Sequence, residues 1–223
     1  MTENGPPRKV QAPRTRQEAR RPGEQAAADR RRRQLLYALA ASGLAALAVV
    51  LVLVLTGGGG EKEISAAMQD AGCTYETRAA QEAKHVAEDE KPKWDTDPPS
   101  SGPHYPVTAP FDFYEEPVDQ LRLVHDLEHG GIVISYGDDV PDETVERMRA
   151  WWIDDPNGVA ASPYPKLGEE ITLAAWTAEG AAHGTAHLAR CKAFDEDAFS
   201  TFRDELRANG PEPFPLDALA PGN

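Results

Sequence analysis

Residues 35–56 read LLYALAASGLAALAVVLVLVLT, a run of 22 residues without a charged side chain. A helix of about 20 apolar residues is long enough to cross the hydrocarbon core of a bilayer, which is roughly 30 Å thick. The run therefore predicts one transmembrane helix in contact with the lipid bilayer. It separates a tail of residues 1–34 from the larger remaining part of the chain.

The charges on the two sides of this run predict its orientation. Residues 1–34 carry ten Lys and Arg against four Asp and Glu, and four of the arginines are consecutive at positions 30–33. Residues 57–223 carry 13 basic and 33 acidic side chains. Basic residues beside a span stay on the cytoplasmic side. We therefore expect a single-pass protein of the cell membrane, with the N-terminus cytoplasmic and the acidic C-terminal part outside.

Two other interpretations of the N-terminal part are open. A cleaved signal peptide has a shorter apolar core of about 7–15 residues and a small-residue cleavage site, whereas Gly and charged residues follow this run. An uncleaved signal anchor is therefore favoured. An arginine-rich tail can also indicate nucleic-acid binding, but this tail has no interleaved aromatic residues and its composition is typical of disorder. Attraction to anionic lipid explains the arginines, so we expect no nucleic-acid partner.

The remaining sequence predicts one extracytoplasmic domain. Residues 57–61 form a Gly-rich linker, residues 62–213 are enough for a domain with its own core, and residues 214–223 form a C-terminal tail. Seven prolines between residues 91 and 117 exclude regular structure there and indicate a long ordered loop.

Hydrophobic spacing in this domain predicts an α+β fold. Helical segments are indicated at residues 61–71, 81–90, 118–129, 142–154 and 195–208, the last two most clearly. Strands are indicated at residues 132–136, 170–177 and 186–191, the last two joined by a turn. We expect a small sheet, two or three helices and long Pro-rich loops.

The two cysteines, Cys73 and Cys191, both follow the predicted span. Disulfides form and persist outside the cytoplasm, and a bond closing so long a loop stabilises a fold by on the order of 4–5 kcal/mol. Two thiolates are alternatively metal ligands. The chain has no CxxC motif, which disfavours redox chemistry. We predict a structural disulfide.

Histidine carries the candidate chemistry, and all six histidines follow residue 84. His125 and His129 belong to the sequence HDLEH and share one face if this segment is helical. Two neutral imidazoles at this spacing can bind one divalent metal. His104 lies in a rigid Pro-rich segment. We predict that His104, His125 and His129 bind Cu or Zn, with Glu128 and His85 as supporting residues next to the ligands.

Two further interpretations of these histidines stay open. In the first, the domain is a non-catalytic scaffold for another envelope protein, and the histidines bond to main-chain carbonyls that the prolines leave without partners. In the second, H-x-x-E-H is the inverted zinc-peptidase signature with Glu128 as base. That signature needs a long helix, whereas Gly130 and Gly131 follow at once, and a Ser101–His104 pair lacks a nucleophile elbow. An enzyme is therefore the least favoured reading. His183 and His187 lie in Ala- and Gly-rich sequence, where we expect an exposed hairpin.

One segment also carries a family resemblance. Residues 97–137, DPPSSGPHYPVTAPFDFYEEPVDQLRLVHDLEHGGIVISYG, resemble the bacterial family catalogued as domain of unknown function 3105, whose members read PPTSGPHxP and then LVHxLEHG. The matching positions are Pro98, Pro99, Ser101, Gly102, Pro103, His104, Pro106, His125, Leu127, Glu128, His129 and Gly130. Ser100 replaces a common Thr. The resemblance extends over about residues 62–213 and implies a preceding membrane span and a disulfide, but no reaction.

Overall fold

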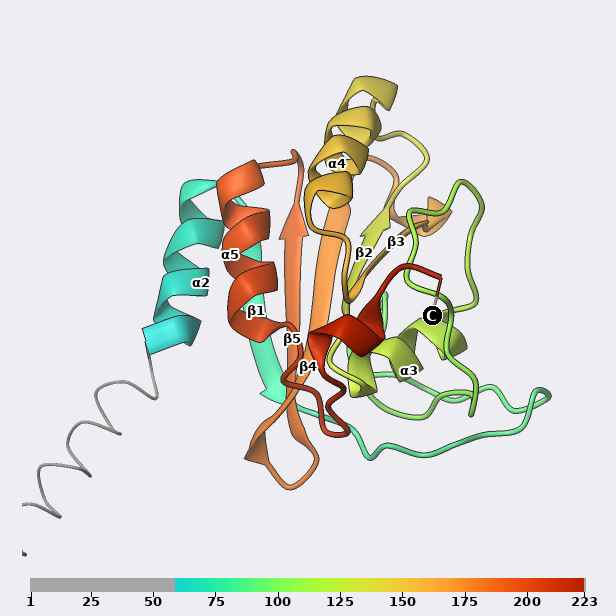
Figure 1. Ribbon diagram of the computed structural model, residues 1–223. Helices are drawn as coiled ribbons and strands as arrows, with labels where there is room; N and C mark the ends of the chain where they lie inside the picture. The colour runs from blue at the N-terminus through green and yellow to red at the C-terminus, as the bar shows by residue number, and fades with distance from the viewer. Residues whose placement is uncertain (1–58, 223) are drawn as a thin grey trace, which may run out of the picture. The chain divides into compact units, whose positions relative to one another are not determined.

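Five strands form one sheet in the computed structural model, which describes residues 59–222 (Figure 1). The strands are β1 (Thr74–Ala79), β2 (Ile132–Tyr136), β3 (Val159–Pro163), β4 (Ile171–Ala181) and β5 (Gly184–Cys191). Their order across the sheet is β1-β5-β4-β2-β3. Only the β2–β3 pair is parallel, and α4 connects these two strands. The predicted α+β class is confirmed.

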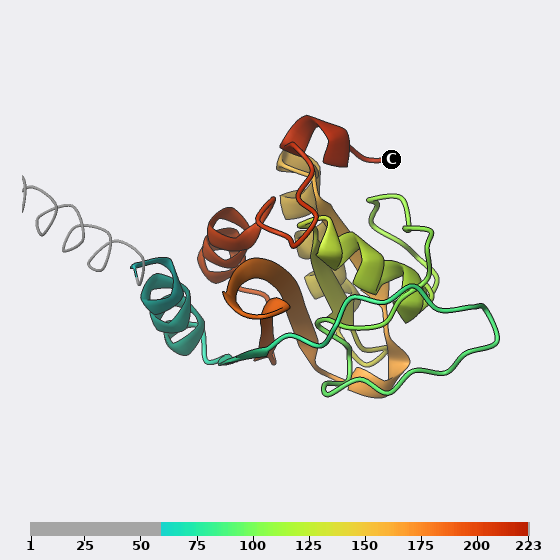
Figure 2. The ribbon, with the colours of Figure 1, turned by 90° about the horizontal axis from the view of Figure 1, so that it is seen from below.

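Four α-helices cover the sheet in this part of the chain, rather than two or three. They are α2 (Gly59–Asp70), α3 (Gln120–Glu128), α4 (Asp142–Asp154) and α5 (Glu196–Leu206), and two 3₁₀ turns are η1 (Pro165–Leu167) and η2 (Leu216–Leu219). Helices α2, α4 and α5 pack on one face, with α2 and α5 side by side (Figures 1 and 2). Helix α3 packs on the opposite face together with η2.

The alternation of side chains along β4 divides the core into two layers. Ile171, Leu173 and Ala175 belong to the cluster under α2, α4 and α5. Ala174 and Trp176 belong to the cluster under α3. This arrangement follows from the two-residue period of a strand. Both faces of β4 are therefore buried over its first seven residues, which are apolar except for Thr172 and Thr177, while its last four residues are exposed.

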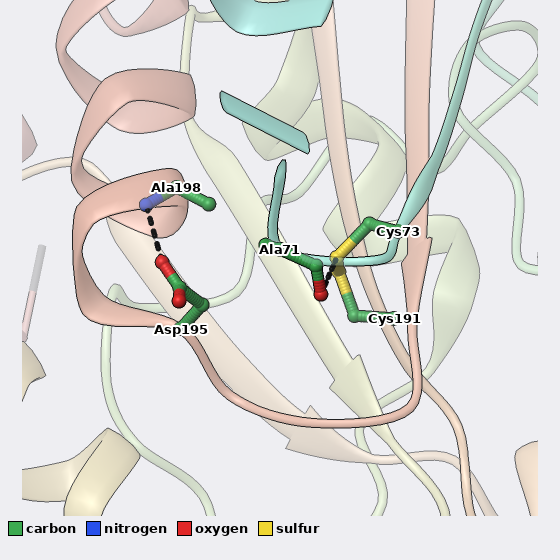
Figure 3. Close-up of a disulfide and its surroundings, with 5 residues drawn as sticks. All are labelled: Ala71, Cys73, Cys191, Asp195 and Ala198. Carbon is green, nitrogen blue, oxygen red and sulfur yellow. Dashed lines mark hydrogen bonds between the residues drawn. A yellow bond between two sulfur atoms is a disulfide. The ribbon is translucent and has the colours of Figure 1, made fainter. Parts of the chain in front are cut away.

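The disulfide between Cys73 and Cys191 is confirmed. It joins the residue before β1 to the last residue of β5, across a sequence separation of 118 (Figure 3). Close to it, the side chain of Asp195 accepts a hydrogen bond from the Ala198 N–H at 3.0 Å and caps the first turn of α5. The bond therefore fixes the edge strand β1 to the sheet, next to the start of α5.

Several local expectations are corrected by the structure. Residues 81–90 are not helical; His85 forms an isolated bridge with His104, and a turn follows at residues 88–89. Strands β1 and β3 were not predicted, because TYETRA is polar and mostly exposed while VAASP has small side chains and a proline. The predicted tail tip also packs, since Leu219 is buried.

The predicted transmembrane run lies outside the described residues, as do the N-terminal tail and the first two linker residues. Helix α2 begins at Gly59, within the predicted linker. Within residues 59–222, no helix is both long enough and apolar enough to cross a membrane.

Candidate metal centre

A tightly folded loop places His104. The Ser101 hydroxyl accepts a hydrogen bond from the Gln81 N–H at 3.1 Å, and the Trp94 indole N–H donates to the Pro103 carbonyl at 3.0 Å. Gly102 has a φ of +114° and lies against the side chains of Gln81 and Trp94, so a Cβ at this position would be strained and crowded. The PPSSGPH sequence thus builds a rigid loop that presents the His104 ring.

Helix α3 places His125 and Glu128. The Asp119 side chain caps its N-terminus by accepting a hydrogen bond from the Leu121 N–H at 2.9 Å. Its C-terminus is a Schellman motif, in which the N–H groups of Gly130 and Gly131 donate to the carbonyls of Leu127 and Asp126. Gly130 has a φ of +89°, as this motif requires. His125 and Glu128, three residues apart, therefore face the same way.

A short extended pairing brings His85 to this group. The His104 N–H donates to the Lys84 carbonyl and the Val86 N–H donates to the His104 carbonyl, both at 2.9 Å, so that His85 and His104 form an isolated parallel β-bridge. The ring centroid of His85 lies 5.1 Å from those of both His104 and His125. Residues far apart in the sequence thus meet at one place.

The result is a cluster of three imidazoles and one carboxylate, which we call the His/Glu cluster: His85, His104, His125 and Glu128. One ligand atom from each residue lies within 4.8 Å of those of the other three. Burial divides the cluster, because His104, His125 and Glu128 are buried while His85 is exposed. The geometry thus groups four side chains of types that can bind a metal ion, with His85 on the side exposed to solvent.

The hydrogen bonds of His104 fix its tautomer. Its Nδ1 lies 2.8 Å from the Gly102 carbonyl oxygen, which can only accept, so Nδ1 carries a proton and donates. The other nitrogen, Nε2, lies 3.0 Å from a carboxylate oxygen of the buried Glu128. In the neutral ring, Nε2 is also an acceptor. Two acceptors in contact repel one another unless a cation lies between them, either a proton or a metal ion.

Burial and neighbouring charges shift the pKa values of the other two buried residues of the cluster, His125 and Glu128. Burial lowers the pKa of His125 to about 4, and positive charge on His104 and His129 acts in the same direction. His125 is therefore neutral at pH 7, the form in which imidazole binds metals. Burial alone raises the pKa of Glu128, but the His104 hydrogen bond and the neighbouring imidazoles outweigh this effect and leave it below its usual value. Glu128 is consequently an anion.

A family model described as "Protein of unknown function (DUF3105)" matches residues 85–216, more than half of the chain. The chain belongs to the DUF3105 family. No curated protein and no solved structure matches it. All four residues of the His/Glu cluster lie within the DUF3105 match, which begins at His85, whereas Cys73 lies before it.

His129 does not join the other predicted ligands in the DUF3105 domain. Its Nδ1 lies 3.1 Å from the Glu212 carbonyl oxygen, to which it donates, and Phe214 packs edge-on against its ring. His129 is the C-cap residue of α3, beyond the last helical turn. Its ring still lies 4.6 Å from that of His125, between the His/Glu cluster and the C-terminal segment.

His85 and Glu128 were predicted only as supporting residues, yet their side chains lie in the cluster itself. The spacing of Glu128 from His125, three residues along a helix, is a signal that favours a shared face. The sequence carries no such signal for His85, because its position depends on a β-bridge to His104 in another segment. Ser101 holds the loop rather than contacting His104, since its hydroxyl accepts from the Gln81 N–H. The last residue of the zinc-peptidase signature, His129, is likewise off the helix, since α3 ends at Glu128.

The expectation of a solvated His187 is wrong, although His183 is exposed on the β4–β5 hairpin. The His187 ring is buried in β5, with Nδ1 2.7 Å from the Tyr75 hydroxyl and Nε2 2.9 Å from the Thr177 hydroxyl. These contacts link β1, β5 and β4. Burial lowers the pKa of His187 to about 4. The ring is therefore a neutral part of the DUF3105 fold.

We expect this buried ring to make stability depend on pH. Because its pKa falls from 6.5 to about 4 on folding, the unfolded chain takes up a proton first as the pH falls. The contribution of the neutral His187 ring to the free energy of unfolding is complete above pH 6.5. It decreases by about 3 kcal/mol between pH 6.5 and 4. Urea unfolding at both pH values measures it. His187→Gln should remove the pH dependence due to His187 and leave that due to His125, whereas His183→Gln should leave the pH dependence unchanged. Equal pH dependence in the wild type and His187→Gln would show that His187 is not the group responsible.

Proposed function

We propose that this domain binds one divalent transition metal ion, Zn²⁺ or Cu²⁺, through His85, His104, His125 and Glu128. The observation that carries the proposal is the contact of 3.0 Å between His104 Nε2 and the Glu128 carboxylate. The opposite nitrogen of His104 donates to the main chain. In metal sites, a ligating histidine characteristically donates its other N–H to a carbonyl, which orients the lone pair toward the metal.

The donor set and the spacing both suit such an ion. Three imidazole nitrogens and one carboxylate oxygen suit Zn²⁺ and Cu²⁺. With bonds of about 2.0 Å, tetrahedral ligands are roughly 3.3 Å apart, so the present separations of up to 4.8 Å need only modest side-chain movement. Cu⁺ prefers sulfur ligands. The two cysteines form the disulfide, and Met68 and Met148 are buried in the core under the other face of the sheet.

We also propose that the domain is held outside the cell membrane by a helix of residues 35–56, with the N-terminus cytoplasmic. The uncharged run and the basic residues before it support this topology. The disulfide supports it independently, because such bonds persist in oxidising compartments. The metal would then be bound on the outer side of the membrane.

A second candidate function is a non-catalytic scaffold for another envelope protein. In this case, His104 is protonated, and its ion pair with Glu128 joins the Pro-rich loop to α3. The observation that favours it is that His104 and His129 both bond to main-chain carbonyls. The two functions differ in what lies between Nε2 and the carboxylate, which is a proton in the scaffold and a metal ion in the metal module.

Metal analysis of the purified full chain tests the proposal. We expect one Zn²⁺ or Cu²⁺ per chain, found by elemental analysis or on titration. Binding free energies of roughly 10–16 kcal/mol shared among four ligands correspond to about a hundredfold or more per ligand lost. The double variant His104→Ala/His125→Ala should therefore bind metal about ten-thousandfold or more weakly than the wild type.

Two further variants serve as controls. His183→Ala removes an exposed imidazole far along the hairpin and should bind metal like the wild type. His129→Ala removes the histidine that lies outside the cluster and should retain one metal per chain. The metal function would be overturned by a wild-type chain that binds neither Zn²⁺ nor Cu²⁺, or by a double variant that binds metal as tightly as the wild type. The first result would favour the scaffold.

A further inference from the structure

The His/Glu cluster is asymmetric in burial. His104 is fully buried, and His125 and Glu128 are 6% and 5% exposed. His85 is exposed, as are the residues on its N-terminal side from Glu82 to Lys84. Access to the cluster from solvent is therefore on the His85 side.

The four side chains also differ in how firmly hydrogen bonds and the backbone hold them. His104 is held through its ring by the Gly102 carbonyl and through its backbone by the β-bridge. His125 and Glu128 stand on a helix that is capped at both ends. The His85 ring, by contrast, makes no hydrogen bond to the described part of the chain and contacts the other two imidazoles only by ring packing. Its backbone is fixed by the bridge, so the ring can turn outward without displacing the chain.

From this arrangement we infer that His85 is the exchangeable ligand, through which the site passes its metal to an acceptor with nitrogen donors. The inference rests on the proposed metal function. His104, His125 and Glu128 retain the ion while an acceptor nitrogen approaches from solvent. A bond from the metal to the first acceptor nitrogen forms, and the bond from the metal to the His85 nitrogen breaks, which leaves a neutral imidazole. Further acceptor nitrogens then replace the Glu128 oxygen and the nitrogens of His125 and His104 in turn, so that four bonds form and four break. The oxidation state of the metal does not change.

The exchange follows from general properties of metal sites. Zinc accepts a fifth ligand transiently, so an incoming ligand can bind before His85 leaves. A site closed by four buried side chains would offer no position for such an approach. An exposed ligand without a hydrogen-bonding partner loses little on leaving, because water replaces its contacts. Because nitrogen ligands suit both Zn²⁺ and Cu²⁺, the acceptor is a carrier or a chelating molecule that presents nitrogen ligands.

Zinc transfer to a colorimetric pyridyl chelator tests the inference on the full, zinc-loaded chain. In the wild type, the transfer rate should rise in proportion to chelator concentration. His85→Ala should still bind zinc through the other three ligands, about a hundredfold more weakly, the loss expected for one of four ligands, and should transfer it at least tenfold faster. Lys84→Ala, an exposed neighbour of His85, should transfer zinc at the wild-type rate.

The outcomes separate the two proposals. If the wild type binds no zinc, this inference fails, and the metal function fails with it only if Cu²⁺ is not bound either. If zinc binds but His85→Ala abolishes binding as completely as His104→Ala, or transfers zinc no faster than the wild type, the exchange role is wrong and the metal function stands. Circular dichroism of each variant confirms that it is folded. Alkylation of His85 in the metal-free chain, prevented by bound zinc, gives a second readout that does not depend on a substitution.

Discussion

Gly130→Ala is expected to lower the free energy of unfolding by roughly 2–5 kcal/mol. The backbone at Gly130 has a φ of +89°, and this left-handed region costs an Ala about 1–2 kcal/mol. A Cβ there would also lie 2.8 Å from the Cα of Ala208, which is backbone and cannot turn aside. Overpacking of this kind adds roughly 1–3 kcal/mol. The end of α3 would shift, and the Glu128 carboxylate would move with it.

Gly72→Ala is the matched control for this substitution. Gly72 has a φ of +72°, but no atom lies within 4 Å of a Cβ built there. It therefore carries the backbone cost alone, about 1–2 kcal/mol. Urea unfolding followed by tryptophan fluorescence measures both variants. Equal losses in the two would show that the close approach of Ala208 and Gly210 to Gly130 adds no cost beyond that of the left-handed backbone.

Replacing both cysteines, Cys73→Ser/Cys191→Ser, is expected to lower the free energy of unfolding by about 4 kcal/mol. The bond closes a loop across a sequence separation of 118, and the stabilisation in the chain-entropy model increases with loop length. The protein should remain folded in the absence of denaturant but unfold at a lower urea concentration. Edge strand β1, whose residues are largely exposed, depends most on this bond.

Chemical reduction of the wild type gives the control. Reduced wild type and the double variant should unfold at similar urea concentrations, since both lack the cross-link. The disulfide lies on the α5 side of the sheet and the His/Glu cluster on the α3 side, so metal affinity of the folded double variant should be unchanged. A loss below about 1 kcal/mol would show that the bond is not what holds β1 and the chain before it to the sheet.

Helices and strands were predictable where the hydrophobic pattern ended at a glycine or proline that also ends regular structure. The predicted ranges of β2 and α4 are the observed ones, because the apolar run of β2 ends at Gly137 and α4 lies between prolines. Strands β1 and β3 were not predicted, because pairing with neighbouring strands defines them and neither has an alternating hydrophobic pattern. β1 is a polar edge strand that pairs with β5, and β3 has small side chains and pairs in parallel with β2.

The sequence by itself determined the α+β class, the disulfide and the motif that carries His104, His125 and Glu128. The class and the motif depend on residue types and spacings that each segment carries locally, and the disulfide depends on two cysteines that both follow the predicted span. Only the tertiary structure decided which side chains meet. Positions three and four residues beyond His125 both suit a shared helical face, and the end of α3 at Glu128 selects Glu128 over His129. His85 arrives through a bridge between distant segments, and long-range pairing of this kind leaves no periodic trace in the sequence.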